Sequence, residues 1–143
     1  MIVEALIDSG PLVAYYSRSD KWHGCARKFF ESFRGRLIIS EPVVTEVMWL
    51  LSTDWRVQNE FLTDLQNELL VIASLIPSDF QCIAELNKKY RDLPGDYADL
   101  SVVALSERLG LLNVVSLHSD FDIYRAYGKK NFKQLFPKGQ KFK

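Results

Sequence analysis

Short apolar runs alternate along the chain with longer segments in which apolar residues recur every three or four positions. A short apolar run between turn residues is typical of a buried strand, whereas the three- and four-residue spacing is typical of an amphipathic helix. The expected strands cover residues 3–7, 36–40, 70–75 and 113–117, with a last edge strand at 132–136. The expected helices cover residues 11–17, 22–33, 42–53, 55–68, 79–90 and 98–109.

Proline and glycine support several of these boundaries. Pro11 suits the first position of a helix, with Ser9 or Gly10 as its cap, and Gly110 suits the position just after a helix. A turn is expected at Leu93-Pro94-Gly95. Strands separated by helices predict an α/β fold with a mainly parallel sheet and helices on both faces. Ligands of such sheets gather at the carboxyl ends of the strands, so we expect the chemistry just after the strands.

The composition is that of an ordinary globular protein, with 48% of the 143 residues hydrophobic and 25% charged. This length is typical of one domain, so we expect a single domain over residues 1–143. Cys25 and Cys82 lie far apart and, with only His23 and His118 available, do not match the spacing of a zinc site. We expect both cysteines to be small core residues in a reducing compartment.

Neither a secretory signal nor a membrane span is expected. The first ten residues lack a basic segment and include Glu4 and Asp8. No uninterrupted apolar run approaches the ~20 residues that cross a membrane. The expected location is therefore the cytoplasm, without a membrane partner.

The net charge is zero, but the charges are unevenly distributed. Residues 129–143 contain six lysines and no acid, which leaves 12 basic and 18 acidic residues, a balance of −6, in residues 1–128. An acidic body indicates a cation site, and the lysine-rich segment offers a contact for a polyanion.

Ionisable side chains follow three of the predicted strands, at the sheet edge where ligands are expected. They are Asp8 after the first strand, Glu46 in the helix after the second, Asp96 and Asp99 at the start of the last helix, and His118, Asp120 and Asp122 after the fourth strand. Glu46 lies three residues after Val43 and four before Leu50, so it faces the same way as the apolar stripe. A carboxylate there costs several kcal/mol unless it is paired or bound to a metal.

Each acid also has a local interpretation. Asp96 fits a helix N-cap, and Asp99 fits a first-turn acid that the helix dipole favours. Asp8 fits a turn residue, and Glu46 fits a surface glutamate at the margin of the stripe. The combination favours a metal site, because converging carboxylates repel one another unless a cation lies between them. Mg²⁺ or Mn²⁺ suits such ligands and activates water for attack on a phosphodiester.

Four segments resemble the PIN-domain family, and most of all the VapC-type ribonucleases of bacterial toxin–antitoxin pairs. The segments are LIDSGPLVAYY at 6–16, SEPVVTEVMWLL at 40–51, GDYADLSVVALSERLG at 95–110 and VVSLHSDFDIYR at 114–125. The resemblance implies a Rossmann-like three-layer α/β/α sandwich and RNA cleavage that depends on Mg²⁺ or Mn²⁺. It matches Asp8, Glu46 and Asp99 to the family's three main catalytic acids, with Asp96 as an additional one. Asp8, Asp96 and Asp99 are then the expected metal ligands.

His118 departs from the family pattern, which has an aspartate at this position. An imidazole ligates Mn²⁺ but is a poorer ligand for Mg²⁺. Either His118 itself is a metal ligand, or Asp120 replaces it, or a second metal is weakened or absent. The local interpretation is a neutral polar residue at the mouth of the site.

RNA, in single strands or loops, is the expected substrate because its phosphates and bases are accessible. Lys129 and Lys130 are candidate backbone contacts, whereas Arg125 either contacts phosphate or neutralises the acids. In the edge strand, the aromatic residues at 132 and 136 are expected to pack inward, and the alternative is that they stack on bases of the RNA. The resemblance also implies a cognate antitoxin and a possible homodimer. Candidate surface residues for these partners, which equally suit the core, are Tyr15, Trp49 and Trp55.

Two rival functions remain open. One is a catalytically weak or inactive PIN-like module that binds RNA or protein, with His118 marking the altered site. The other is a metal phosphohydrolase of small molecules. A dinucleotide-binding domain is not supported, since Asp8-Ser9-Gly10-Pro11 lacks the glycines that let a pyrophosphate approach.

Overall fold

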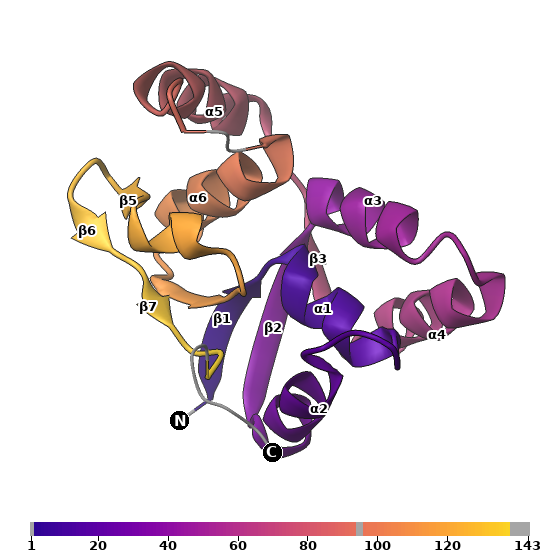
Figure 1. Ribbon diagram of the computed structural model, residues 1–143. Helices are drawn as coiled ribbons and strands as arrows, with labels where there is room; N and C mark the ends of the chain where they lie inside the picture. Colours follow the sequence, from indigo (N-terminus) through magenta and orange to yellow (C-terminus); the bar gives the residue numbers. More distant parts are fainter. Residues whose placement is uncertain (1, 94–95, 138–143) are drawn as a thin grey trace.

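Five parallel strands form the central sheet, in the order β3-β2-β1-β4-β7 (Figure 1). The computed structural model describes residues 2–93 and 96–137. The strands are β1 Val3–Ile7, β2 Gly35–Ser40, β3 Val71–Ala73, β4 Asn113–Val115 and β7 Lys133–Gln134. The parallel sheet and its last edge strand, both predicted from the apolar pattern, are confirmed.

Helices cover both faces of this sheet. They are α1 Ser9–Tyr16, α2 His23–Ser32, α3 Glu41–Leu50, α4 Trp55–Gln66, α5 Pro77–Lys89 and α6 Tyr97–Leu109. β2 and β3 are added in turn on one side of β1, and β4 then lies on the other side of β1. Because crossovers between parallel strands are right-handed, α1–α4 and α5–α6 lie on opposite faces. The result is the expected three-layer α/β/α sandwich.

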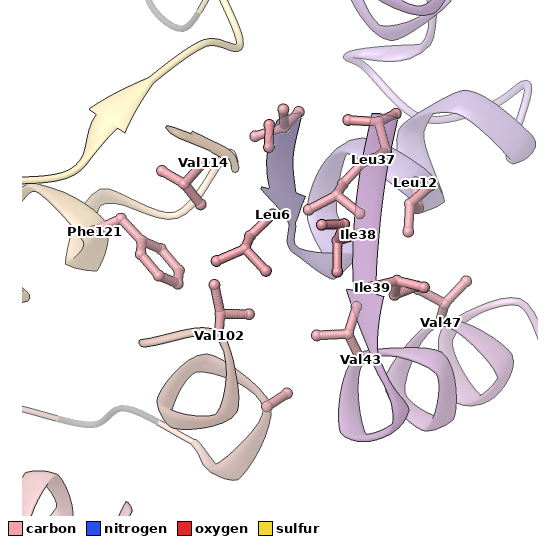
Figure 2. Packing of buried hydrophobic residues seen from close by; sticks show 14 of the residues in the cluster. Leu6, Leu12, Leu37, Ile38, Ile39, Val43, Val47, Val102, Val114 and Phe121 are labelled. Carbon is pink, nitrogen blue, oxygen red and sulfur yellow. The ribbon is translucent and has the colours of Figure 1, made fainter. Parts of the chain in front are cut away.

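The buried apolar residues form one core that spans both faces of the sheet. Figure 2 shows Leu6 of β1 beside Val102 of α6 and Phe121, whereas Leu12 of α1 and Val47 of α3 lie on the other side of β2. All five are almost completely buried. The central strands β1, β2 and β4 therefore carry buried apolar side chains, as the inner strands of a parallel sheet do.

The helices begin or end up to three residues away from the predicted boundaries, and two of these differences have a clear local cause. α1 begins at Ser9 with Asp8 as its N-cap, so the helix starts two residues earlier than Pro11 indicated. Proline is tolerated in the first turn because N–H groups there have no partner within the helix. α3 ends at Leu50 instead of residue 53, because Asp54 takes an extended conformation and caps α4 by accepting the Arg56 N–H.

Three strands are shorter than the apolar runs predicted. β3 covers only 71–73 and β7 only 133–134, because each is an edge strand with a single neighbour. β4 ends at Val115, since the N–H of Ser116 is taken by the side-chain oxygen of Gln134 at 2.9 Å. The turn predicted at Leu93-Pro94-Gly95 extends outside the described residues.

The segment after β4 holds structure that the apolar pattern did not predict. A 3₁₀ turn, η1, covers Ser119–Asp122, and a hairpin pairs β5 Arg125–Ala126 with β6 Lys130–Asn131. The hairpin turns at Tyr127 and Gly128, which both have positive φ, a conformation favoured in tight hairpins. Gly110 caps α6 in the left-handed conformation, as predicted.

Cys25 is buried, and Cys82 is half-buried and packs against the core; both thiols are free. Within the described part of the chain, no helix is both long and apolar enough to cross a membrane.

Candidate metal and catalytic site

A pocket of about 240 Å³ opens at the carboxyl ends of the central strands. β1 and β4 are neighbours in the sheet, and the connections that follow them run to opposite edges of the sheet, β1 to β2 and β4 toward β7. Open α/β sheets bind ligands at such switch points. The described residues that line the pocket are Asp8, Ser9, Gly10, Glu46, Asp96, Asp99, Leu117 and His118. The four acids predicted from the sequence thus line one pocket.

Asp8 is buried at the end of β1, where its N–H bonds to the carbonyl of Val115 at 2.9 Å. Its Oδ2 accepts a 3.1 Å hydrogen bond from the Ser116 hydroxyl, and its Oδ1 has no partner among residues 2–93 and 96–137. Burial raises the pKa of Asp8, although hydrogen bonds from Ser9 and Ser116 oppose the rise. The side chain makes no helix-capping bond, so a local turn or cap role does not explain the acid.

Asp96 and Asp99 have different environments at the start of α6. Asp96 is exposed, and its Oδ1 accepts the Asp99 N–H at 2.9 Å, so the predicted capping role is correct for this residue. Asp99 is only 3% exposed. Burial, followed by the charges of Asp8, Asp96, Glu46 and Asp120, raises the pKa of Asp99 to about 8. A first-turn acid facing solvent would not have this environment.

Glu46 reaches the pocket from α3. It is half-buried, and its Oε1 accepts a hydrogen bond from the hydroxyl of Ser9. Burial raises the pKa of Glu46 to about 7, and a side-chain hydrogen bond with Asp96 contributes, while the Ser9 bond opposes the shift. Val43 is buried as predicted but Leu50 is exposed, so the apolar stripe is shorter than the spacing indicated.

His118 stands at the exposed mouth of the pocket. Its Nδ1 lies 2.9 Å from Oδ2 of Asp99 without the alignment of a hydrogen bond, and its Nε2 lies 3.4 Å from Oδ2 of the buried Asp120. One potential ligand atom each from Asp8, Asp99 and His118 lies within 4.8 Å of the others. His118, with Asp120 behind it, therefore completes the mouth of the pocket. Asp122 is exposed and is not among the residues that line the pocket.

The candidate basic contacts differ in how free their side chains are. Arg125 uses Nη1 to donate to the carbonyls of Asp122, Ile123 and Tyr124, at 2.8 to 3.0 Å. Lys129 and Lys130 are exposed on the hairpin. Arg125 therefore holds the turn after η1, and the two lysines present charge to solvent. Lys138, Lys141 and Lys143, also part of the lysine-rich segment, lie outside the described residues.

The aromatic candidates divide between core and surface. Phe136 is buried and Phe132 is half-buried, so both pack inward as the edge-strand interpretation expects. Tyr15 is half-buried against the core, whereas Trp49 and Trp55 are 75% and 67% exposed. Of these three partner-surface candidates, Trp49 and Trp55 are therefore the two that are exposed.

Three polar residues near the acids were missed by the sequence reasoning. Ser9 and Ser116 are buried and donate to Glu46 and Asp8. The hydroxyl of Tyr124 is buried without a hydrogen-bond partner in the described structure, and burial, then the charge of Asp99, raises its pKa. Adjacency to Asp8 was a signal for Ser9, but nothing local marks Tyr124.

Comparisons with known proteins agree with this architecture. The chain is 25% identical over 130 residues to Ribonuclease VapC26 of Mycobacterium tuberculosis (strain ATCC 25618 / H37Rv), covering 89% of this chain and 96% of the relative. The crystal structure of M. tuberculosis VapC20, a sarcin-ricin loop cleaving toxin, superimposes with a TM-score of 0.77 at 16% identity, covering 83% of this chain and 93% of that one.

Two further structures share the fold at low identity. A toxin–antitoxin complex from Klebsiella pneumoniae has a TM-score of 0.63 at 17% identity, covering 80% of this chain and 87% of that one. VapBC2 from Rickettsia felis, bound to a DNA fragment from its promoter, has a TM-score of 0.66 at 12% identity, covering 92% and 98%. The model of the PIN domain matches residues 5–129. With this match over most of its length, the chain belongs to the PIN-domain family.

Proposed function

We propose that this protein is a divalent-metal-dependent endoribonuclease of a toxin–antitoxin type, which hydrolyses RNA phosphodiesters with a metal-activated water. One observation carries the proposal. The buried Oδ1 of Asp8 has no hydrogen-bond partner in the described structure and lies in a pocket with Asp99, another buried acid. Buried carboxylate oxygens without partners are rare unless a ligand satisfies them.

The donor set fits a divalent cation. Asp8, Asp99 and His118 would hold it, with Asp96 at the rim of the same pocket. Burial and mutual repulsion raise the pKa values of Asp8 and Asp99, and a cation between them reverses that penalty. When bound, Mg²⁺ or Mn²⁺ supplies a water of lowered pKa and offsets negative charge on the phosphate.

Glu46 is suited to proton transfer. Its pKa of about 7 lies near neutral pH, where a general acid or base is most effective. The Ser9 hydroxyl orients its Oε1, and Asp96 contacts the same carboxyl group. We assign Glu46 the role of holding the proton released from the attacking water, and Asp96 that of sharing it.

RNA and an antitoxin are the proposed substrate and partner. The curated relative is a ribonuclease, VapC20 is a toxin that cleaves the sarcin-ricin loop, and another structural relative is a toxin–antitoxin complex. Lys129 and Lys130, whose side chains are exposed, are the proposed contacts for the RNA backbone. Trp49 and Trp55 are proposed as part of a surface for the antitoxin or for a second copy of this chain.

Cleavage of a labelled single-stranded RNA by the full chain tests the function. We expect products with Mn²⁺ or Mg²⁺, none with a chelator, and a loss of about 100-fold or more in Asp8→Asn. Equal activity of wild type and Asp8→Asn would exclude the metal-nuclease mechanism. Cleavage of bis-p-nitrophenyl phosphate but not of RNA would instead favour a small-molecule phosphohydrolase.

His118 favours one alternative, a PIN-like module that binds RNA or protein with weak or no catalysis. The residue replaces the expected aspartate and lies beside Asp99. Binding of the same RNA with unchanged affinity in Asp8→Asn, without cleavage by either protein, would support this alternative.

A further inference from the structure

His118 is the only imidazole among the described residues that line the acidic pocket. The other described lining residues are carboxylates, a serine, a glycine and a leucine, so every other charged group there offers oxygen. A single nitrogen donor among carboxylates calls for a physical explanation of its own.

The distances around Nδ1 of His118 suit two neighbouring ligands of one ion. Ligands at right angles on an octahedral ion with bonds of about 2.1 Å lie about 3.0 Å apart. Nδ1 of His118 and Oδ2 of Asp99 are 2.9 Å apart, but the oxygen accepts no aligned hydrogen bond. Asp8 supplies a third atom within 4.8 Å, and its own Oδ1 is buried without a partner in residues 2–93 and 96–137.

The other ring nitrogen has the support that a histidine ligand requires. A metal-bound imidazole generally donates its remaining N–H to a carboxylate or carbonyl, which fixes the tautomer and the ring orientation. Nε2 of His118 lies 3.4 Å from Oδ2 of Asp120, which is buried. Asp120 is therefore placed as a positioning residue behind the imidazole. The backbone of His118 is held as well, because its N–H donates to the Ser116 hydroxyl at 2.9 Å.

We propose that His118 is a metal ligand through Nδ1 and makes this site select a first-row transition-metal dication, such as Mn²⁺, over Mg²⁺. The inference rests on the proposed metal-dependent function and specifies which ion that function uses. Mg²⁺ prefers oxygen ligands in a near-ideal octahedron, so replacing a carboxylate with imidazole weakens its binding. First-row transition ions accept two carboxylates together with an imidazole nitrogen.

Pulsed electron paramagnetic resonance of Mn²⁺ bound to the metal-free full chain tests the nitrogen ligand directly. We expect nitrogen coupling to Mn²⁺ in the wild type and its loss in His118→Asp. His23→Asn is the matched control, because the chain has only two histidines and His23 contacts the Ala14 carbonyl outside the pocket. This control retains the coupling.

Competition between the ions tests the selectivity. Mg²⁺ is titrated into the Mn²⁺-loaded wild type and, in parallel, into Mn²⁺-loaded His118→Asp. The paramagnetic resonance signal of free Mn²⁺ measures how much Mn²⁺ each protein has released. We expect the preference for Mn²⁺ over Mg²⁺ to fall by about tenfold or more in His118→Asp. Asp120→Asn keeps the nitrogen coupling but weakens Mn²⁺ binding by about tenfold, as loss of a supporting carboxylate does.

Absence of nitrogen coupling in wild type, with Mn²⁺ binding that Asp8→Asn abolishes, would overturn the role of His118 and leave the proposed function standing. Mn²⁺ binding that neither Asp8→Asn nor His118→Asp changes would refute both. The wild-type spectrum decides the ligand question even if His118→Asp does not fold. An unchanged ratio of the two affinities in a folded His118→Asp would refute the selectivity.

Discussion

Ser116 donates its hydroxyl hydrogen to Oδ2 of Asp8 over 3.1 Å, and its oxygen accepts the N–H of His118 at 2.9 Å. The first contact joins residues 108 positions apart, because β1 and β4 are parallel neighbours whose carboxyl ends meet. A single buried hydroxyl therefore orients an acid and the segment that carries the imidazole.

Ser116→Ala removes this link. We expect metal-dependent RNA cleavage to fall by about tenfold, since Asp8 loses its support, and the free energy of unfolding to fall by about 1 kcal/mol. Cleavage rates and urea denaturation measure the two effects. Ser32→Ala, an exposed serine on α2, is the control and should change neither. Lower stability with unchanged cleavage would mean that Ser116 has only a structural role.

Asp99→Asn is expected to stabilise the metal-free protein while it inactivates the enzyme. At pH 8 the wild type holds several acids in one pocket, and their charges and burial raise the pKa of Asp99 to about 8. About half of the Asp99 carboxyls are ionised at this pH, and an amide removes their share of the burial cost and of the repulsion. The melting temperature should rise by about 3 °C, and cleavage should fall about 100-fold or more. A melting temperature of metal-free Asp99→Asn below that of the wild type would contradict repulsion among the acids of the pocket.

The stability of the metal-free protein should depend on pH through the same acids. In the unfolded chain, Glu46 and Asp99 lose their protons near their ordinary pKa values of 4.5 and 3.8, whereas in the folded protein they hold them to about 7 and about 8. Between these limits the folded state binds more protons, so stability falls as pH rises from about 5 to about 8. Melting temperatures across this range test the slope, and saturating Mn²⁺ should flatten it. A melting temperature that rises with pH would contradict the raised pKa values.

The ion pair between Asp79 and Arg108 is expected to stabilise the contact between α5 and α6. Nε of Arg108 lies 3.1 Å from each oxygen of the buried Asp79, and Nη2 donates to the Ser74 carbonyl at 2.7 Å. Arg108→Ala removes the ion pair of the buried Asp79 and leaves it, within the described structure, only the 2.9 Å hydrogen bond from the Ile76 N–H. Because Arg108 is partly exposed, we expect a loss of about 2–3 kcal/mol in urea denaturation.

The matched control for this prediction is Arg27→Ala. Arg27 pairs with Glu31 at 3.1 Å on the exposed surface of α2, so its loss should cost less than about 0.5 kcal/mol. Equal effects of the two arginine substitutions would show that burial of Asp79 does not matter.

Lys129 and Lys130 are expected to contribute charge to RNA binding and little to the fold, because both are exposed and Lys130 Nζ only lies over the Tyr127 ring at 5.6 Å. Replacing both with alanine should reduce the slope of log affinity against log salt by about 1.4, as the loss of two phosphate contacts with single-stranded RNA does. Arg125→Ala should instead lower the melting temperature, because Arg125 binds three backbone carbonyls. An unchanged salt slope in the double variant would remove the two lysines from the RNA-binding surface.

The sequence by itself determined the order along the chain of the six helices and the five sheet strands of the described structure, the parallel sheet and the edge at which the acids gather. These follow from local features, namely apolar spacing, turn residues and the rule that parallel strands end on one side. The positions of Asp8, Glu46, Asp96 and Asp99 after their strands were enough to predict that they line one pocket.

Only the tertiary structure decided what each acid contacts. Asp96 caps α6, whereas Asp8 and Asp99 are buried with oxygens that lack partners within the described residues. Serines hold Glu46 and Asp8 from positions 37 and 108 residues away, and the 3₁₀ turn places Asp120 behind His118. Such contacts, and the exposure of each side chain, depend on how distant elements pack, which the spacing of residues along one segment does not encode.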